Sequence, residues 1–260
     1  MRIINFHTHI YPEPIAEKAT AAIGKFYTIE MDRIGTSEHL IKECRENGID
    51  KCVIHSVATT AHQVPSINNF VIGECKKHKE FYGFAAMHPD FTDFEPELER
   101  VIKAGLKGVK IHPDTQQFDM DDERMFPFYE AISGRLPILI HCGDYRYKYS
   151  HPEKLARILD LFPKLTVIGA HFGGWSMPDL ALEYLKDRNC YMDISSSFFV
   201  TGRKRAEELI KIYGAERMVF GTDFPMWDTK AELDNFFALN LTDKEKELIL
   251  HKNAERILNI

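Results

Sequence analysis

Two histidines near the start of the chain, His7 and His9, have the spacing of a metal-binding pair. They follow the apolar run Ile3–Phe6, and side chains two residues apart on a strand point to the same side. Two neutral imidazoles that project together provide half of the ligands of a typical divalent metal site. A His-x-His pair is common by chance, so this interpretation depends on polar residues that other strands bring to the same place.

Two other apolar runs also end in polar residues. His141 ends the run Pro137–His141, and Asp223 follows the run Met218–Gly221. We predict that His7, His9, His141 and Asp223 form one metal site, because three neutral imidazoles and one carboxylate suit Zn²⁺. Water would complete the shell, and Zn²⁺ lowers the pKa of such a water to about 7, which makes it a nucleophile at neutral pH.

A further histidine, His171, follows the run Thr166–Ala170 and precedes Gly173 and Gly174. The glycines allow backbone or substrate to approach closely. We expect His171 to lie beside the metal ion, where it can polarise a carbonyl group or transfer a proton. Asp223 would share this catalytic role by accepting a proton from the attacking water.

Lys110 and His112, at the end of another run, are candidate substrate-binding residues. The favoured role of Lys110 is to bind a substrate carboxylate. Two alternatives remain open, namely an ordinary buried lysine paired with a carboxylate and a carbamylated lysine that bridges two metal ions. His112 precedes Pro113 and either lines the pocket or holds a loop through hydrogen bonds. His55 and His88 are interpreted as packing residues or as residues that support the ligands.

Eight short apolar runs bring these candidates to strand ends, and segments of helical periodicity separate the runs. The runs are Ile3–Phe6, Lys51–Ser56, Phe81–Met87, Lys107–Ile111, Pro137–His141, Thr166–Ala170, Cys190–Ile194 and Met218–Gly221. Their number, and their spacing of roughly 25 to 50 residues, predict an α/β fold, a (β/α)8 TIM barrel. We expect one domain over residues 1–260 with its chemistry at the carboxyl ends of the strands. A doubly wound open sheet is the alternative, but it usually has a Gly-rich first turn that this sequence lacks.

The first connection is long, and we expect it to hold a helix at Pro14–Ile23 followed by a loop or short strands at Phe26–Ile29. At the other end of the chain, the pattern predicts a helix over Thr242–Leu258, which begins with the capping signal Thr242-Asp243 followed by Glu245.

Composition limits the classes of partner. The net charge is -6 over 260 residues, so the chain has no basic patch for nucleic acid. No apolar run has the length of a membrane span, and the early first strand leaves no room for a signal peptide. Five cysteines without a CxxC motif indicate reduced thiols and a cytoplasmic protein. A homodimer is the default oligomer.

Motifs along nearly the whole chain resemble one known group. They are Asn5-Phe-His-Thr-His, Gly108-Val-Lys-Ile-His-Pro, Pro137-Ile-Leu-Ile-His, Ile168-Gly-Ala-His-Phe-Gly-Gly, Gly214-Ala-Glu-Arg-Met-Val-Phe-Gly-Thr-Asp-Phe-Pro and Asn253-Ala-Glu-Arg-Ile-Leu. The same motifs occur in the same order in the amidohydrolase superfamily, and the chain most resembles its amidohydrolase-related (family 2) branch. That branch contains metal-dependent TIM-barrel hydrolases and decarboxylases, among them aminocarboxymuconate-semialdehyde decarboxylase.

The resemblance implies roles by position. His7, His9, His141 and Asp223 match the metal ligands of the first, fifth and eighth strands, and Asp223 also matches the proton shuttle. His171 matches a histidine that acts on substrate in single-metal members and binds a second metal in others. The chain lacks a glutamate on the fourth strand. One ion is therefore favoured, with two as the alternative if Lys110 is carbamylated or His171 is a ligand.

The sequence is compatible with three functions. The leading hypothesis is a hydrolase in which a metal-activated water attacks an amide, lactone or ester of a small molecule. The alternative is a metal-dependent non-oxidative decarboxylase, in which Lys110, Tyr145 or Arg146 would hold the substrate carboxylate. Trp175 belongs to a set of aromatic residues near strand ends that we expect to line the pocket. A barrel that only binds or supports a partner is disfavoured, because unused ligands would carry a desolvation cost.

Overall fold

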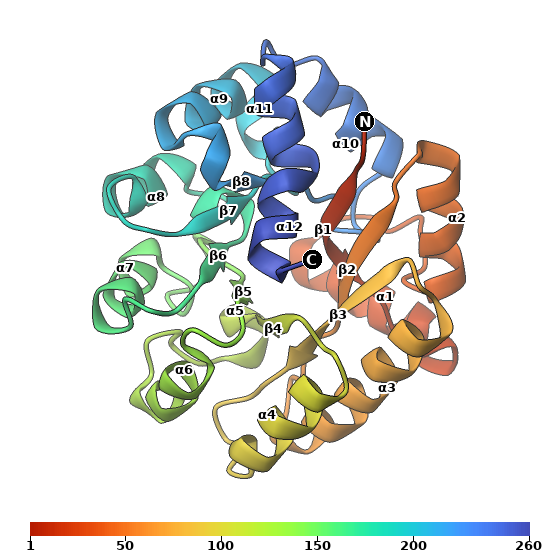
Figure 1. The fold of residues 1–260 in the computed structure, drawn as a ribbon, viewed down its shortest axis with the longest axis vertical. Coiled ribbons are helices and arrows are strands. Elements are labelled where there is room, and N and C mark those ends of the chain that lie inside the picture. Colours follow the sequence, from red (N-terminus) through yellow and green to blue (C-terminus); the bar gives the residue numbers. More distant parts are fainter.

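Eight parallel strands form a ring at the centre of the molecule, and helices surround them (Figure 1). The computed structural model describes residues 1–260. Neighbouring strands follow the order of the sequence from β1 to β8. The strands are β1 (Ile4–His9), β2 (Lys51–His55), β3 (Phe81–Ala86), β4 (Gly108–Ile111), β5 (Ile138–Ile140), β6 (Val167–Gly169), β7 (Tyr191–Asp193) and β8 (Met218–Val219).

Backbone hydrogen bonds close the ring between β1 and the segment that follows β8. Phe6 N donates to Phe220 O at 2.8 Å, and Asp223 N donates to His7 O at 2.9 Å. Thr8 also pairs in parallel with Phe224. The predicted TIM barrel is confirmed, and its closure brings Asp223 next to His7.

The helices follow the strands in alternation. They are α1 (Glu13–Tyr27), α2 (Ser37–Asn47), α3 (Val64–Lys77), α4 (Phe94–Lys103), α5 (Pro113–Gln116), α6 (Phe126–Ile132), α7 (Pro152–Leu161), α8 (Pro178–Leu185), α9 (Phe198–Tyr213), α10 (Thr229–Phe237), α11 (Asp243–Glu247) and α12 (Asn253–Leu258). None of them combines the length and the apolar character that a membrane crossing requires.

Local sequence explains where several helices begin and end. At the start of α2, the Thr36 hydroxyl accepts a hydrogen bond from His39 N at 3.2 Å, and Gly48 ends the helix at a φ of 69°. Thr242 and Glu245 form a capping box at α11. The helix predicted from Thr242 is divided, because a π-helical segment, Leu248–Lys252, separates α11 from α12.

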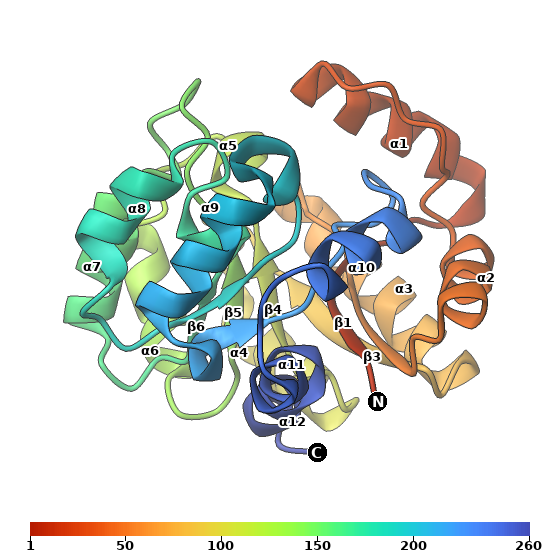
Figure 2. The ribbon, with the colours of Figure 1, turned by 90° about the horizontal axis from the view of Figure 1, so that it is seen from above.

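Helix α1 is longer than predicted. It continues past Ile23 to Tyr27, and the segment Phe26–Ile29 forms no strand. Thr28 ends the helix in the left-handed conformation at a φ of 57°. The ring of Phe26 stacks on Tyr147, with centroids 5.3 Å apart, so tertiary packing overrides the strand propensity of these residues. Figure 2 shows α1 at the end of the barrel opposite α11 and α12.

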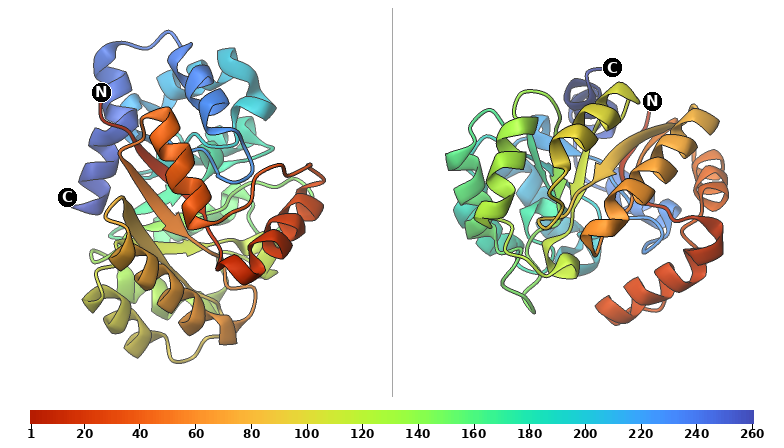
Figure 3. Two further views of the ribbon diagram at one scale, coloured as in Figure 1. Left: turned by 90° about the vertical axis from the view of Figure 1, so that its right-hand side faces the viewer. Right: turned by 90° about the horizontal axis from the view of Figure 1, so that it is seen from below.

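Two apolar layers stabilise the barrel. Inside the ring, Phe6 and Phe84 meet edge to face within a cluster of 11 buried residues. This cluster includes Ile257 and Leu258 of α12, which therefore closes the end of the barrel away from α1 (Figure 3). A second cluster of 59 buried residues packs the strands against the outer helices. The apolar interior thus fills one end of the barrel and leaves the other end to polar residues.

We expect the substitution Leu258→Ala to lower the free energy of unfolding by about 2–5 kcal/mol, because it leaves a cavity under the barrel. Leu258 is 3% exposed. Leu161→Ala is the control, since Leu161 is 48% exposed and its truncation should change stability by less than about 0.5 kcal/mol. Urea denaturation measures both variants, and equal losses would show that α12 does not contribute to the core.

Candidate metal centre at the barrel mouth

Three side chains from the two closing segments of the barrel converge at its mouth. His7 Nε2 lies 3.1 Å from His9 Nε2, and Asp223 Oδ1 lies 3.3 Å from the first and 3.4 Å from the second. Ligand atoms about 2.0–2.2 Å from a shared ion have separations of this size. The three groups therefore fit one divalent cation without rearrangement.

Asp193 fixes the orientation of His7. The Nδ1–H of His7 donates to Asp193 Oδ2 at 2.9 Å, which leaves the Nε2 lone pair directed towards His9 and Asp223. Burial alone would raise the pKa of Asp193, but His7 and its hydrogen bond lower it to about 2. Burial lowers the pKa of His7 to about 4, and the charge of Lys110 acts in the same direction. His7 is therefore neutral at pH 7, as a metal ligand must be.

Asp223 is held in the same way on its other oxygen. Ser196 donates its hydroxyl to Asp223 Oδ2 at 2.5 Å, and Trp227 Nε1 donates to Ser196 Oγ at 2.5 Å. Burial favours the neutral acid, yet His7 and His9 hold the pKa of Asp223 well below its ordinary value. The carboxylate is consequently ionised, with Oδ1 free to face a cation.

His141 joins the site through His171. His141 Nδ1 lies 3.2 Å from His171 Nε2, and the Nδ1–H of His171 donates to Ser195 O at 2.9 Å. His141 Nε2 lies 3.5 Å from Asp114 Oδ2 and has no hydrogen-bond partner. Burial raises the pKa of Asp114 to about 7. His141 and His171 therefore form a second nitrogen pair, and ligand atoms of His171, His7 and Asp223 all lie within 4.8 Å of one another.

Lys110 lies below the mouth, fully buried, with Nζ 3.3 Å from His7 Nε2. Burial lowers its pKa to about 8, although Asp193 and Asp223 oppose the shift. A lysine with this pKa loses its proton readily when another cation or a carboxyl group approaches. The predicted residue is thus next to the candidate ligands and buried below the mouth.

A cleft opens above these groups. Its lining consists of His7, His9, Tyr11, Ile23, Tyr27, His112, His141, His171, Asp223, Pro225 and Met226. Tyr27 was not foreseen, because the helix that carries it was expected to end earlier. His112 Nδ1 accepts a hydrogen bond from Thr115 N at 3.4 Å, so its Nε2–H donates to the Tyr27 oxygen at 2.8 Å. The hydroxyl hydrogen of Tyr27 remains available for a ligand.

Three of the predicted substrate-binding residues, Lys110, Arg146 and Trp175, are not among the residues that line the cleft. The Nη1 of Arg146 donates to Phe26 O at 2.6 Å and its Nη2 donates to Asp144 Oδ2 at 2.6 Å. Trp175 packs edge-on against Tyr27, with centroids 4.9 Å apart. In the structure Arg146 and Trp175 contact the end of α1.

Backbone conformation is unusual at three residues of the centre. His171, Ser196 and Asp223 have φ values of 58°, 54° and 55°, and such left-handed conformations cost about 1–3 kcal/mol each at non-glycine residues. Residues held this way concentrate at functional sites, because surrounding contacts must maintain them. Ser196 gave no signal in the sequence beyond its place in a serine run after the seventh apolar segment.

Comparisons with known proteins point to one group. The family model described as amidohydrolase matches residues 48–260. The chain is similar to the 5-carboxyvanillate decarboxylase from Sphingomonas paucimobilis, with a TM-score of 0.76, 19% identity and coverage of 100% of this chain and 99% of that chain. No curated protein matches the sequence.

Two further solved structures share the fold. A 5-carboxyvanillate decarboxylase from Novosphingobium aromaticivorans, complexed with manganese and 4-hydroxy-3-methoxy-5-nitrobenzoic acid, has a TM-score of 0.76, 15% identity and coverage of 100% and 96%. A probable 2-pyrone-4,6-dicarboxylic acid hydrolase from Acinetobacter baumannii, with citric acid bound, has a TM-score of 0.74, 17% identity and coverage of 100% of both chains.

We expect the metal-free protein to lose stability as the pH falls below 6.5. The unfolded His7 has its ordinary pKa of 6.5 and the folded residue a pKa of about 4, so the unfolded chain binds more protons in this window. The contribution of His7 is complete above pH 6.5 and declines by on the order of 3 kcal/mol towards pH 4.

Urea denaturation in EDTA between pH 4.5 and pH 7.5 measures this dependence. His7→Gln should show a shallower decline than the wild type, whereas the exposed His62 is the site of a control, His62→Gln, that should keep the wild-type decline. Parallel curves for His7→Gln and the wild type would contradict the expectation.

Proposed function

Since this chain belongs to the amidohydrolase family, we propose that it is a metal-dependent enzyme that removes CO₂ from a small carboxylic acid without oxidation. The convergence of His7, His9 and Asp223 beside the ammonium group of Lys110 carries this proposal. Such a site combines a cation-binding carboxylate with positive charge below it, which suits an anionic substrate.

The donor set fits a single divalent ion at His7, His9 and Asp223. Nitrogen and carboxylate ligands suit Zn²⁺ and Mn²⁺, and one of the similar decarboxylases was crystallised with manganese. His141 and His171 would hold a second ion if Lys110 were carbamylated. When bound, the ion would supply positive charge and Lewis acidity at the oxygen atoms of the substrate.

Side chains of the cleft would orient the substrate and move its proton. The Tyr27 hydroxyl is free to donate to a carboxylate or phenol oxygen, and Lys110 adds positive charge beneath it. The carbon that loses CO₂ keeps the bonding electron pair and must take up a proton. His171 is suited to deliver that proton when its ring is protonated at both nitrogens, because Ser195 O holds the Nδ1–H and Nε2 lies beside His141 at the mouth.

Hydrolysis is the second candidate, and the state of Asp223 favours it. Its ionised carboxylate lies beside the candidate ligands, where it can accept a proton from an attacking water. The similar protein from Acinetobacter baumannii is named for hydrolysis of a pyrone dicarboxylic acid. Decarboxylation ranks first because two of the three similar proteins described above are decarboxylases.

We expect the protein, reconstituted with Zn²⁺ or Mn²⁺, to release CO₂ from an aromatic acid that carries a hydroxyl group beside its carboxylate. A panel of hydroxybenzoates labelled with ¹³C at the carboxyl group, together with a pyrone dicarboxylate, tests this expectation. Asp223→Asn should fold normally and lose at least about 10²-fold in kcat, because it removes an ionised metal ligand in decarboxylation and the proton acceptor in hydrolysis. Ring opening of the pyrone without CO₂ release would support hydrolysis instead, and full activity of Asp223→Asn would refute both mechanisms.

The Tyr27→Phe substitution should raise KM about tenfold with little change in kcat, because a hydrogen bond to a charged substrate group is worth about 1.5–3 kcal/mol and the ring is retained. Tyr147→Phe is the matched control, since Tyr147 stacks on Phe26 and is not among the residues that line the cleft. Steady-state kinetics on the substrate found in the panel separates the two. Equal KM values for Tyr27→Phe and the wild type would exclude Tyr27 from substrate binding.

A further inference from the structure

Ser196 lies between β7 and α9, fully buried, with its backbone at a φ of 54°. Glycine adopts this left-handed region without cost, whereas a serine there is strained. The hydroxyl group makes two contacts that a glycine could not make. It donates to Asp223 Oδ2 at 2.5 Å and accepts from Trp227 Nε1 at 2.5 Å. The side chain of Ser196 therefore links the indole to the candidate metal ligand.

The two hydrogen bonds of this Trp227–Ser196–Asp223 relay have a fixed direction. An indole N–H can only donate, so Ser196 Oγ must accept from Trp227. The single hydroxyl hydrogen is then left for another acceptor. Met226 Sδ, at 3.9 Å, is a weak acceptor, whereas Asp223 Oδ2 is nearer and belongs to an ionised group. Hydrogen bonds in such a series strengthen one another, so the relay holds Oδ2 firmly.

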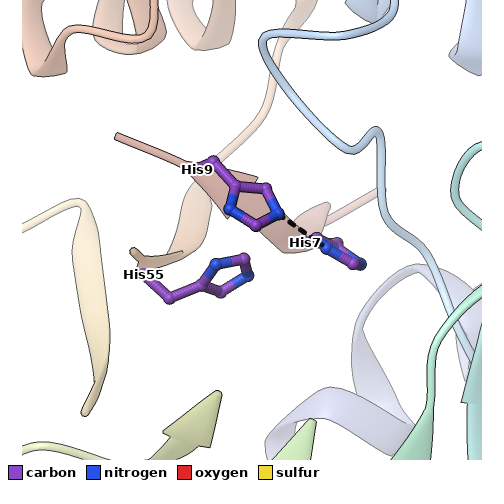
Figure 4. Close-up of side chains that lie close together, drawn as sticks. All are labelled: His7, His9 and His55. Carbon is purple, nitrogen blue, oxygen red and sulfur yellow. Dashed lines mark hydrogen bonds between the residues drawn. The ribbon is translucent and has the colours of Figure 1, made fainter. Parts of the chain in front are cut away.

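Because Oδ2 is engaged, Asp223 has one oxygen left for a cation. Oδ1 lies 3.3 Å from His7 Nε2 and 3.4 Å from His9 Nε2. The two imidazoles meet at 3.1 Å between their Nε2 atoms (Figure 4). A free carboxylate can turn about its Cβ–Cγ bond, where the torsional preference is broad, and can bind an ion through either oxygen or both. The relay prevents this rotation and presents Oδ1 alone to the two histidines.

Aromatic stacking holds the outer end of the relay. The half-buried ring of Trp227 lies 5.0 Å from the ring of Phe199, tilted by 32°. Phe199 belongs to the first turn of α9 and is 68% exposed. Ser196 and Phe199 thus contact Trp227 from one segment, the first at its N–H and the second at its ring. The connection after β7 and the connection after β8 are joined in this way beside Asp223.

We propose that Ser196 is a positioning residue of the metal centre, and that the Trp227–Ser196–Asp223 relay sets the affinity of Asp223 for the cation. This inference rests on the metal centre of the proposed function. Ser196 belongs to none of the motifs that carry the family resemblance. Removal of its hydroxyl leaves the charge of Asp223 in place but releases Oδ2. The carboxylate then loses its orientation, and groups that orient metal ligands typically contribute about 10–100-fold to metal affinity.

Zinc binding to EDTA-treated protein tests this role. Wild type, Ser196→Gly and Ser196→Ala are titrated with Zn²⁺ in competition with a chromophoric chelator. We expect the Zn²⁺ dissociation constant to rise about 10–100-fold in both variants. Glycine suits the backbone and alanine keeps Cβ, so a loss common to both belongs to the hydroxyl. Ser66→Ala is the control, since Ser66 is exposed on α3, and it should keep the wild-type value.

Tryptophan emission gives a readout that a merely structural residue would not move. The chain has two tryptophans, so Trp175→Phe leaves Trp227 as the only emitter. A bound Zn²⁺ ion withdraws charge from Asp223 and weakens both hydrogen bonds of the relay. Saturating Zn²⁺ should therefore shift the emission of Trp227 to shorter wavelength. Addition of Ser196→Gly to the Trp175→Phe protein should abolish this shift at saturating Zn²⁺, because the relay is cut.

Equal Zn²⁺ dissociation constants for the wild type and both Ser196 variants would overturn the role of Ser196. An emission shift that persists in the Trp175→Phe/Ser196→Gly protein would overturn it as well. Asp223→Asn distinguishes this failure from failure of the proposed function. If Asp223→Asn weakens Zn²⁺ binding and Ser196→Gly does not, the metal centre stands and only the positioning role fails. A wild type that binds no Zn²⁺ would overturn the metal centre, and this inference with it.

Discussion

The barrel mouth is organised by buried nitrogen and oxygen atoms of His7, His9 and Asp223 that lie close to one another. The Nδ1–H of neutral His7 donates a hydrogen bond to Asp193. The Nε2 atom of His7 therefore faces His9 and the ionised Asp223 across distances of 3.1–3.4 Å. Such an arrangement is unfavourable in a medium of low dielectric constant unless positive charge lies among the atoms. Lys110 supplies part of that charge, and a divalent cation would supply the rest.

The barrel can hold this unfavourable cluster because one of its ends is an apolar core and the other carries the polar residues. At one end, α12 and the inward apolar side chains form a dry core. At the other end, the bonds between β1 and the segment after β8 fix His7 and Asp223 relative to each other. Packing of the apolar core stabilises the fold. This offsets the cost of the buried charges at the polar end and of the left-handed backbone at His171, Ser196 and Asp223.

Helix α1 gives the cleft its wall, and its anchoring changes the interpretation of a predicted residue. Arg146 was expected to hold a substrate carboxylate, but its guanidinium group contacts Asp144 and the backbone of Phe26. By fixing the end of α1 it positions Tyr27, whose hydroxyl lines the cleft.

The sequence by itself determined the barrel and most of the polar groups at its mouth. Apolar runs alternate with helical segments, and strand periodicity places His7 and His9 on one side, because these are local properties of the chain. Tertiary structure decided what depends on residues far apart. The register of β1 and β2 placed His55 opposite His9, barrel curvature paired His141 with His171, and packing on a distant loop extended α1 to Tyr27. Orientation, proton position and pairing depend on contacts across the barrel, which no local pattern encodes.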